Sequence, residues 1–328
     1  MILDESSKVV ALSGGIGGAK LALGLSRVLP PGALTVIANT ADDSEQLGLH
    51  VSPDIDTLMY TLAGLADPER GWGRRSETWH CMEALEQLGG ETWFRLGDRD
   101  LATNIERTHL MRSGHSLTEI TARFCDHLGV TTCILPMCDG RVRTRICTQD
   151  GTWLAFQDYF VRLRCEPVVR EIAYDGARRA KATSEVLTAV TDPQLAAIVI
   201  CPSNPLLSIE PILAVSGVRE AISASPAPKI AVSPIIGGEA VKGPTAKMLR
   251  ELGIEPSAAA VAERYGSLLD GYIIDEADQA EAARCGVRTF IAPTLMRSEN
   301  DKDALARATL LAAQAIGTSV HGKRRGRS

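Results

Sequence analysis

The sequence has few aromatic residues and no long apolar run. Aromatic side chains make up 4% of its 328 residues, and no apolar stretch approaches the ~18 residues that a membrane-spanning helix needs. The first eight residues contain Asp4 and Glu5 and lack the apolar core of a secretory signal. We therefore expect a cytoplasmic protein that has no membrane partner.

Positive charge is also scarce. The chain has 35 Lys and Arg against 40 Asp and Glu, a net charge of −5 and a pI near 5.8. Duplex nucleic acid and acidic membranes both require a basic face. This balance argues against nucleic acid as a partner, so any anionic ligand must be held by local features of the chain.

The sequence also lacks the cysteine pattern of a zinc ribbon or a disulfide framework, and it lacks the common nucleophilic triads. The eight cysteines are scattered and form no C-x-x-C pair, so we expect reduced, mostly buried thiols. The six histidines are dispersed, and no Ser-His-Asp or Cys-His set is evident. The chemistry should therefore not depend on a covalent nucleophile.

The apolar residues, 45% of the chain, are sufficient for a sizeable core and follow an α/β pattern. A strand is predicted at 8–12, a helix after the glycine-rich residues 13–20, and a second strand at 34–38. A βαβ unit of this kind favours a parallel sheet. Strands at 195–201, 229–233 and 271–275 and a last helix at 302–316 continue the pattern.

Two stretches interrupt that pattern. Helical periodicity between about 55 and 130 predicts a helical insertion, and short strands are predicted at 131–135, 142–147 and 152–156, the last two forming a β-hairpin. We expect one α/β domain over 1–320 with a mostly parallel sheet. The basic residues 321–328 should be a disordered tail rather than an anion-binding arm.

The first candidate site is the glycine-rich segment that follows the first strand. Its residues are Gly14, Gly15, Gly17, Gly18 and Lys20. Glycines before a helix let backbone amides approach a phosphate, although such a turn can also simply pack a helix onto a sheet. The spacing is not that of a Walker A loop, and it departs from the G-x-G-x-x-G of nicotinamide dehydrogenases, which also need an acidic ribose ligand.

The second candidate is a group of carboxylates after the second strand. Asp42, Asp43, Asp54 and Asp56 lie within fifteen residues, close to Asn39, and would repel one another without a nearby positive charge. Such oxygen ligands suit magnesium, which binds one or two carboxylates together with substrate phosphates. The alternative is that Asp54 only caps a helix.

A third group combines charged and aromatic residues. Arg99 stands between Asp98 and Asp100, which could fix its guanidinium for a phosphate or a planar ring. Trp72 lies on a glycine-rich turn and could stack on a ring. Surface ion pairs for Arg99 and a core position for Trp72 are the alternatives.

Two polar loops follow later strands. Ser203 and Asn204 come after one strand, and Ser233, Gly237 and Gly238 come after the next. Ligands of parallel α/β sheets bind at the carboxyl ends of the strands. These loops could therefore hold a nucleotide base or a phosphate.

In their order, these motifs resemble those of the 2-phospho-L-lactate transferase family of coenzyme F-420 biosynthesis. The resemblance extends from residue 8 to about residue 300. The matching blocks are Ser13–Lys20, Asn39–Asp43, Ser52–Thr57, Leu96–Asp100, Leu135–Met137, Pro202–Pro205 and Ser233–Gly237.

The resemblance implies a Rossmann-like, dimeric transferase that requires magnesium. Such an enzyme moves a phosphate-linked three-carbon acid from a guanosine diphosphate ester to the ribityl hydroxyl of the deazaflavin Fo and releases GMP. It implies that Asp42, Asp54 and Asp56 bind magnesium, that Asp54, Asp56 and Arg99 act in catalysis, and that Asp98 lies near Fo. The glycine-rich and serine-containing loops would hold the nucleotide.

Two points stay open. The acid could be phospholactyl, phosphoenolpyruvyl or 3-phosphoglyceryl, which differ too little for one sequence to distinguish. The alternative function is a nucleotide-sugar-binding regulator of carbon metabolism, which should lack the block around Arg99.

Overall fold

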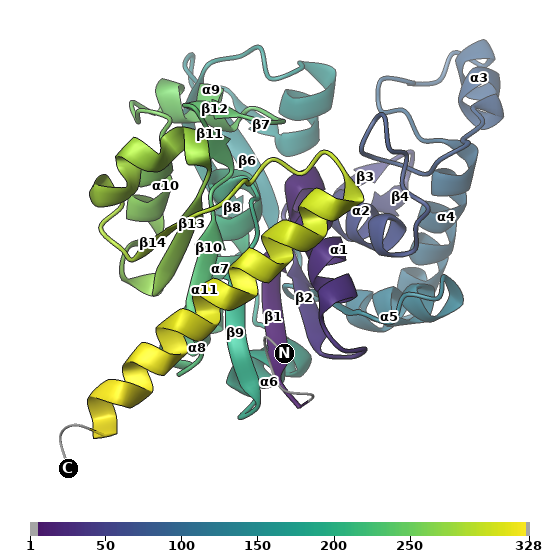
Figure 1. Ribbon diagram of the computed structural model, residues 1–328. Coiled ribbons are helices and arrows are strands. Elements are labelled where there is room, and N and C mark those ends of the chain that lie inside the picture. The colour runs from purple at the N-terminus through teal and green to yellow at the C-terminus, as the bar shows by residue number, and fades with distance from the viewer. Residues whose placement is uncertain (1–5, 326–328) are drawn as a thin grey trace.

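A seven-stranded parallel sheet forms the centre of the molecule (Figure 1). The computed structural model describes residues 6–325, and the side chains of residues 6–318. The strand order is β14-β13-β10-β9-β1-β2-β5. The strands are β1 (Lys8–Ser13), β2 (Leu34–Ala38), β5 (Cys133–Pro136), β9 (Leu195–Ile200), β10 (Lys229–Val232), β13 (Gly271–Ile274) and β14 (Thr289–Ile291). The predicted Rossmann-like α/β fold is confirmed.

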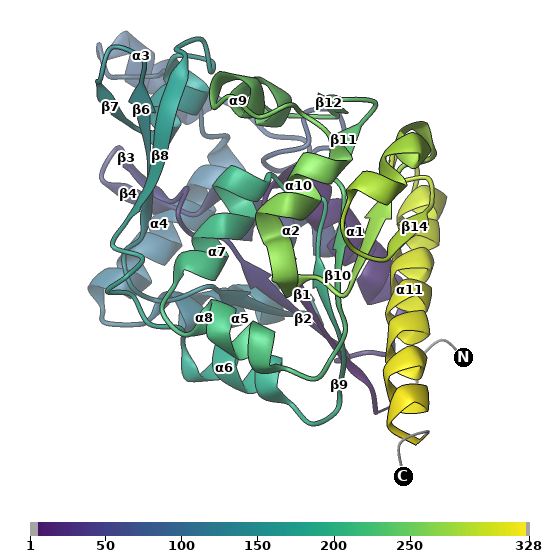
Figure 2. The ribbon, with the colours of Figure 1, turned by 90° about the vertical axis from the view of Figure 1, so that its left-hand side faces the viewer.

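Both faces of the sheet are covered by helices, as the apolar runs of its strands require. In β1, Val9 and Ala11 enter one core, whereas Val10 and Leu12 enter the other. Figure 2 shows α11 on one side of the sheet and α7, α8 and α10 on the other. The first side has α1 (Gly15–Val28), α2 (Pro53–Leu62), α5 (Leu117–His127) and α11 (Glu299–Arg325). The second has α6 (Ser184–Thr191), α7 (Glu210–Ala214), α8 (Val218–Ala224), α9 (Thr245–Glu251) and α10 (Ala258–Tyr265).

The strand order reverses between β1 and β9. From β1 the chain proceeds to β2 and β5 on one side, and from β9 to β10, β13 and β14 on the other. The loops that leave β1 and β9 therefore diverge and leave a crevice at the carboxyl ends of the strands, which is where ligands of such sheets bind.

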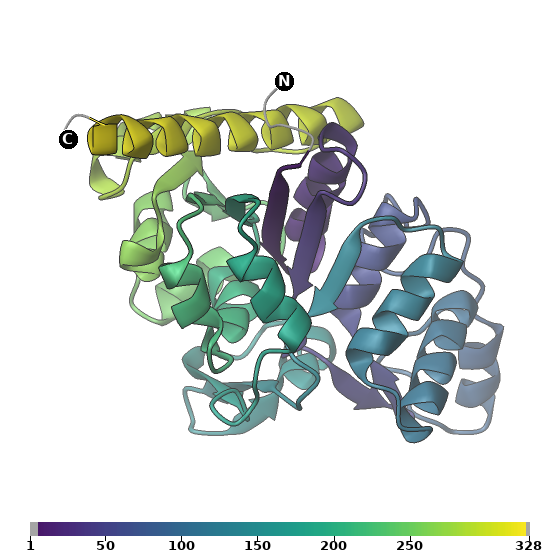
Figure 3. The same ribbon diagram turned by 90° about the horizontal axis from the view of Figure 1, so that it is seen from below.

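The region from 55 to 130 is largely helical. Its first helix, α2, packs on the sheet through Ile55, Leu58 and Met59. Helices α3 (His80–Gln87) and α4 (Asp98–Arg112) lie with α5 beside the β5 edge, as the blue ribbons of Figure 3 show. A hairpin that the sequence did not predict, β3 (Ser44–Gln46) and β4 (Leu49–Val51), precedes them.

A second excursion from the sheet forms a small antiparallel layer. Strands β6 (Arg143–Thr148) and β7 (Trp153–Ala155) are the predicted hairpin. A third strand, β8 (Val169–Asp175), pairs with β6 and was not predicted. The remaining elements are η1 (Asp158–Arg162), η2 (Pro205–Ile209), η3 (Gly266–Leu268), η4 (Glu276–Arg284), β11 (Ile235–Ile236) and β12 (Glu239–Ala240).

The last helix is longer than the sequence predicted. Helix α11 starts before residue 302 and continues to Arg325, so it includes the first part of the expected tail, while residues 326–328 lie outside the described chain. Within the described residues, no helix is long and apolar enough to span a membrane. All eight cysteines are unpaired, and five of them are buried.

Candidate active site

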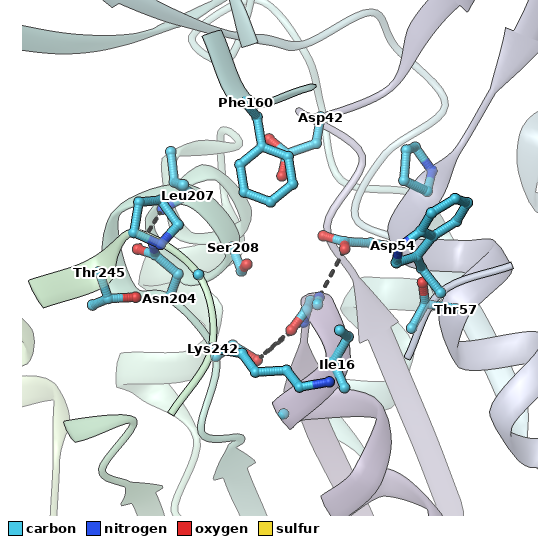
Figure 4. A pocket seen from close by; sticks show the side chains of 18 of the residues that line it. Ile16, Asp42, Asp54, Thr57, Phe160, Asn204, Leu207, Ser208, Lys242 and Thr245 are labelled. Atoms are coloured by element: carbon cyan, nitrogen blue, oxygen red, sulfur yellow. Dashed lines mark hydrogen bonds between the residues drawn. The ribbon is translucent and has the colours of Figure 1, made fainter. Parts of the chain in front are cut away.

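A cavity of about 650 Å³ opens at the reversal point of the sheet. Its walls come from the start of α1, the start of α2, the loops after β9 and β10, and η1. Figure 4 shows Asn204 and Thr245 on one side of this cavity and Thr57 on the other, with Asp54 between them. The cavity therefore brings together loops that are more than 100 residues apart in sequence.

The loops after β1 and β9 are joined by Ser203. Its Oγ donates to the carbonyl oxygen of Gly14 at 2.7 Å and accepts from the Gly14 amide at 3.2 Å. A Cβ on Gly14 would lie 2.6 Å from both Asp54 Oδ2 and Ser208 Cβ. Position 14 therefore needs glycine because three segments meet there.

Helix α1 begins at Gly15, so Gly17, Gly18 and Lys20 lie within the helix rather than in a loop. A Cβ on Gly17 would be 2.4 Å from the Pro202 carbonyl oxygen, and one on Gly18 would be 2.3 Å from Ser13 Oγ. These two glycines thus allow the helix to approach the strand ends closely. Gly14, Gly15 and Gly17 line the cavity, whereas Gly18 is not part of its lining.

Asp54 occupies the amino end of α1. Its Oδ1 accepts from the Gly15 amide at 2.7 Å, and its Oδ2 accepts from Asn39 Nδ2 at 2.9 Å. Asn39 lies just outside the lining and also donates to the Leu207 carbonyl oxygen. Burial raises the pKa of Asp54 to about 6, even though these hydrogen bonds favour its charged form.

Asp42 enters the same cavity from the loop after β2 (Figure 4). Its Oδ1 is buried and has no hydrogen-bond partner among the described residues. Burial raises its pKa well above the ordinary value, and the charge of Asp54 raises it further. The neighbouring Asp43 is engaged elsewhere, since His50 Nε2 and Ser52 Oγ contact its Oδ2 at 3.0 and 2.9 Å.

Asp56 also lines the cavity but is held by a buried arginine. Arg107, on α4, forms an ion pair with Asp56, and its Nη1 also donates to Asn104 Oδ1 at 2.7 Å. Burial raises the pKa of Asp56, and the Arg107 charge opposes that rise. Sequence reasoning missed Arg107 because its pairing depends on how α4 crosses α2.

The block around Arg99 is arranged differently from the prediction. Asp98 accepts from Thr78 Oγ1 and from the His80 and Cys81 amides, so it caps α3. Arg99 is exposed, and its Nη1 donates to the Arg75 carbonyl oxygen at 3.2 Å. Neither Asp98 nor Arg99 lines the cavity, whereas their neighbour Asp100 does.

Aromatic residues form part of the wall. Trp72, Trp93 and Phe94 line the cavity on the side of α2 and α4. Phe156 and Phe160 stack with ring centroids 5.2 Å apart and also line it. These two phenylalanines were not predicted as site residues, because the antiparallel excursion brings them to the cavity.

The loops after β9 and β10 contribute polar groups. Ser203, Asn204 and Ser233 line the cavity, and the side-chain oxygen of Asn204 caps η2. Asn204 Nδ2 has no hydrogen-bond partner among the described residues. Gly237 and Gly238, outside the lining, form the turn of the β11–β12 hairpin with φ values of 58° and 76°.

Two lysines bring positive charge to this side. Lys20 donates from Nζ to the Met296 carbonyl oxygen at 2.8 Å, and Lys242 follows the β11–β12 hairpin. Both line the cavity. Burial lowers the pKa of Lys20, and the positive charges of Lys242 and Lys302 lower it further. A bound anion would relieve this repulsion.

A family model described as 2-phospho-L-lactate transferase CofD matches residues 9–303. The chain belongs to the CofD family. The predicted resemblance is thereby confirmed, and the chain is a transferase that acts on small molecules in coenzyme F-420 biosynthesis.

Curated relatives match the chain over nearly its full length. A phosphoenolpyruvate transferase of Streptomyces coelicolor is 42% identical over 317 residues, covering 94% of this chain and 99% of the relative. One from Mycobacterium ulcerans is 39% identical over 335 residues, covering 95% of this chain and 100% of the relative.

Solved structures share the fold of this CofD family member. A member of the UPF0052 family from Bacillus halodurans superposes with a TM-score of 0.61 at 16% identity, covering 91% of this chain and 98% of that one. A second structure of this same protein, BH3568, gives a TM-score of 0.62 at 18% identity, covering 93% of this chain and 99% of that one.

Proposed function

We propose that the chain transfers a phosphoenolpyruvyl group from a guanosine diphosphate ester to the ribityl hydroxyl of Fo and releases GMP. The names of the curated relatives, both phosphoenolpyruvate transferases, support the phosphoenolpyruvyl donor over the phospholactyl and 3-phosphoglyceryl alternatives. The observation that carries the proposal is one cavity with two chemically different walls and a pair of buried carboxylates between them.

The walls suit two different substrates. The wall from α1 and the loops after β9 and β10 offers Lys20, Lys242 and the unpartnered side-chain N–H groups of Asn204, which suit a nucleoside diphosphate. The wall from α2 and residues 72–100 offers indole and phenyl rings, which suit a flat deazaflavin. The reacting groups would meet at Asp42 and Asp54.

Asp42 and Asp54 fit a magnesium ion. They are two buried carboxylates whose pKa values are raised, and Asp42 has an unpartnered oxygen. No group of three or more acidic, histidine or cysteine side chains suited to a metal occurs in the described chain, so the remaining ligands would be substrate phosphates and water. When bound, magnesium would neutralise phosphate charge at this point.

The chain's own residues would position the reaction. The Fo hydroxyl oxygen forms a bond to the phosphorus that carries the enolpyruvyl group, the bond from that phosphorus to the bridging oxygen breaks, and GMP leaves with that oxygen. We assign the hydroxyl proton to the Asp42 carboxylate, through the oxygen that magnesium would leave free, because Asp42 lines the cavity and its raised pKa favours uptake of a proton. Asp54, anchored by Gly15 and Asn39, keeps its place during the transfer. Asp56 is held by Arg107, and Asp98 and Arg99 carry no step.

One assay tests this function. Purified protein is mixed with magnesium, Fo and each of the three guanosine esters in turn, and the phosphodiester product and GMP are followed by mass spectrometry. We expect product from the enolpyruvyl ester. Product only from another ester would change the donor, and no product from any ester would overturn the proposal.

A variant of the carboxylate pair tests the site. Asp42→Asn should lower turnover by at least a hundredfold, because positioned acid–base groups contribute about 10²- to 10⁴-fold. Asp126→Asn, an exposed residue of α5 outside the cavity, makes the same change of charge and should retain activity. Equal turnover of the two variants would contradict the assignment.

A further inference from the structure

Asp100 is a buried carboxylate of the cavity that the proposed reaction does not use. It is 8% exposed and is the third residue of α4, in the first turn after the N-cap residue Gly97. It lines the cavity on the aromatic wall, next to Leu96. A buried carboxylate in such surroundings costs stability unless it is well partnered, so its partners decide what it can do.

The surrounding residues hold Asp100 in a fixed position. The Tyr60 hydroxyl lies 2.8 Å from Asp100 Oδ1 and equally close to Thr103 Oγ1. The Glu77 carboxylate accepts hydrogen bonds from the backbone amides of Arg99 and Asp100 at 2.8 and 2.9 Å. A Cβ on Gly97 would be 2.3 Å from Glu77 Cδ, so glycine at 97 is what lets Glu77 reach the helix end.

One oxygen of Asp100 is left for a ligand. Oδ1 accepts from Tyr60, whereas no side chain or amide of the described residues hydrogen-bonds to Oδ2. Since the residue lines the cavity, this oxygen can accept a hydrogen bond from a bound molecule. The partner must therefore present an N–H or O–H group at the aromatic wall.

The location selects the part of the substrate concerned. Tyr60 lies six residues after Asp54 on α2, about 9 Å along the helix, so Asp100 is well separated from the carboxylate pair. A group that reacts at Asp42 and Asp54 would be too far away to touch it. The molecule that lies along this wall is the acceptor, whose ring would extend from the reacting chain toward Asp100.

We infer that Asp100 recognises the ring of the acceptor by accepting a hydrogen bond from one of its N–H or O–H groups through Oδ2. Tyr60 is then a positioning residue that fixes the carboxylate. This inference rests on the proposed function, which places a flat heterocycle against the aromatic wall.

The test compares Asp100→Asn with wild type and with Asp126→Asn. Asparagine keeps the shape of the aspartate side chain, and its oxygen can still accept the hydrogen bond from Tyr60. Its NH2 group, however, would face the N–H or O–H group of the ring, so that hydrogen bond is lost. Fo binding is measured directly from the quenching of its fluorescence, and the KM values for Fo and for the guanosine ester are measured separately.

At pH 8, above the pKa of about 7 that Asp100 has in its buried position, we expect Asp100→Asn to raise the dissociation constant and the KM for Fo by at least about tenfold, the size of one hydrogen bond to a charged group. The KM for the guanosine ester should change less than about twofold. Tyr60→Phe, which keeps the ring but removes the hydroxyl, should weaken Fo binding to a smaller degree and in the same selective way.

The outcomes separate the two hypotheses. If wild type binds and converts Fo but Asp100→Asn matches it, or if both KM values rise together, the inference is overturned and the proposed function stands. If wild type neither binds nor converts Fo, the proposed function fails and takes the inference with it.

Discussion

Lys20 and Lys242 bring two like charges to one wall of the cavity, and their repulsion lowers the pKa of Lys20 in addition to the effect of burial. A diphosphate would turn this repulsion into attraction. We expect Lys242→Met to raise the KM for the guanosine ester by about tenfold or more, since hydrogen bonds to charged groups contribute about 1.5–3 kcal/mol.

Steady-state kinetics at low and high ionic strength would measure this effect. Lys181→Met, an exposed lysine outside the cavity, is the matched control. A KM for Fo that rises as much as the KM for the ester would show that Lys242 does not act on the nucleotide.

The raised pKa of Asp100 should also make the stability of the protein depend on pH. Burial and, to a lesser degree, the charge of Asp56 together raise this pKa to about 7. Because the folded state holds this proton more tightly than the unfolded chain does, the stability it contributes falls as pH rises from about 4 to 7. Asp100→Asn should therefore raise the melting temperature more at pH 8 than at pH 5.

Thermal unfolding of both proteins at the two pH values measures this difference. The groups that act on Asp100 in the same network are Asp56, Tyr60, Glu77 and Arg107. A constant difference between the two proteins across this range would contradict the raised pKa.

At the scale of elements, the crossing of α1 and α11 depends on one glycine. A Cβ on Gly24 would lie 2.2 Å from the Lys302 carbonyl oxygen, which belongs to the backbone and cannot rotate away. Gly24→Ala should thus separate the helices and destabilise the protein by about 1–3 kcal/mol, as overpacking does.

Gly317→Ala on α11 is a matched control for this crossing. A Cβ there would meet Pro228 only at 3.8 Å, so the substitution should be neutral or stabilising by up to about 1 kcal/mol through helix propensity. Urea unfolding distinguishes the two variants, and equal stabilities would mean that the close crossing does not constrain residue 24.

The elements that could be predicted from the sequence are those whose apolar residues are continuous. Strands β1, β9 and β10 are buried on both faces, so their runs of apolar residues were sufficient. Strand β8 was missed because Arg170 and Glu171 are exposed within it. Strand β14 was missed because it is an edge strand of three residues, which is too short to show a pattern.

The sequence predicted which segments form the site better than it predicted which residues of those segments face the cavity. The Leu96–Asp100 block was recognised, but successive helix residues point about 100° apart. Which of Asp98, Arg99 and Asp100 meets the cavity therefore depends on the orientation of α4. In the structure it is Asp100.

At the scale of the whole molecule, the side chains that the structure describes form three hydrophobic cores of unequal size. Two large cores cover the faces of the sheet, whereas the third contains only Val51, Leu96 and Leu101 as buried members. Of residues 67–97, the segment that contains α3, only Leu96 and the partly buried Phe94 belong to a core, and it is this small one. Few buried apolar contacts imply a low free energy of local opening.

Hydrogen exchange followed by mass spectrometry should show this inequality. We expect amides of 67–97 to exchange well before those of β1 and β9, and addition of Fo to slow their exchange. Equal protection of both regions would contradict the prediction.

The hydrogen bond from the Gly15 amide to Asp54 affects which charged ligands can approach the first turn of α1. In many nucleotide-binding folds the first turn of the helix is vacant and attracts a bare phosphate. Here a carboxylate already occupies that turn, and Asp42 stands beside it. Under the proposed function, a nucleotide that arrives with its full negative charge would meet like charge at this point, so we expect the ester bound to a cation to be favoured over the free ester.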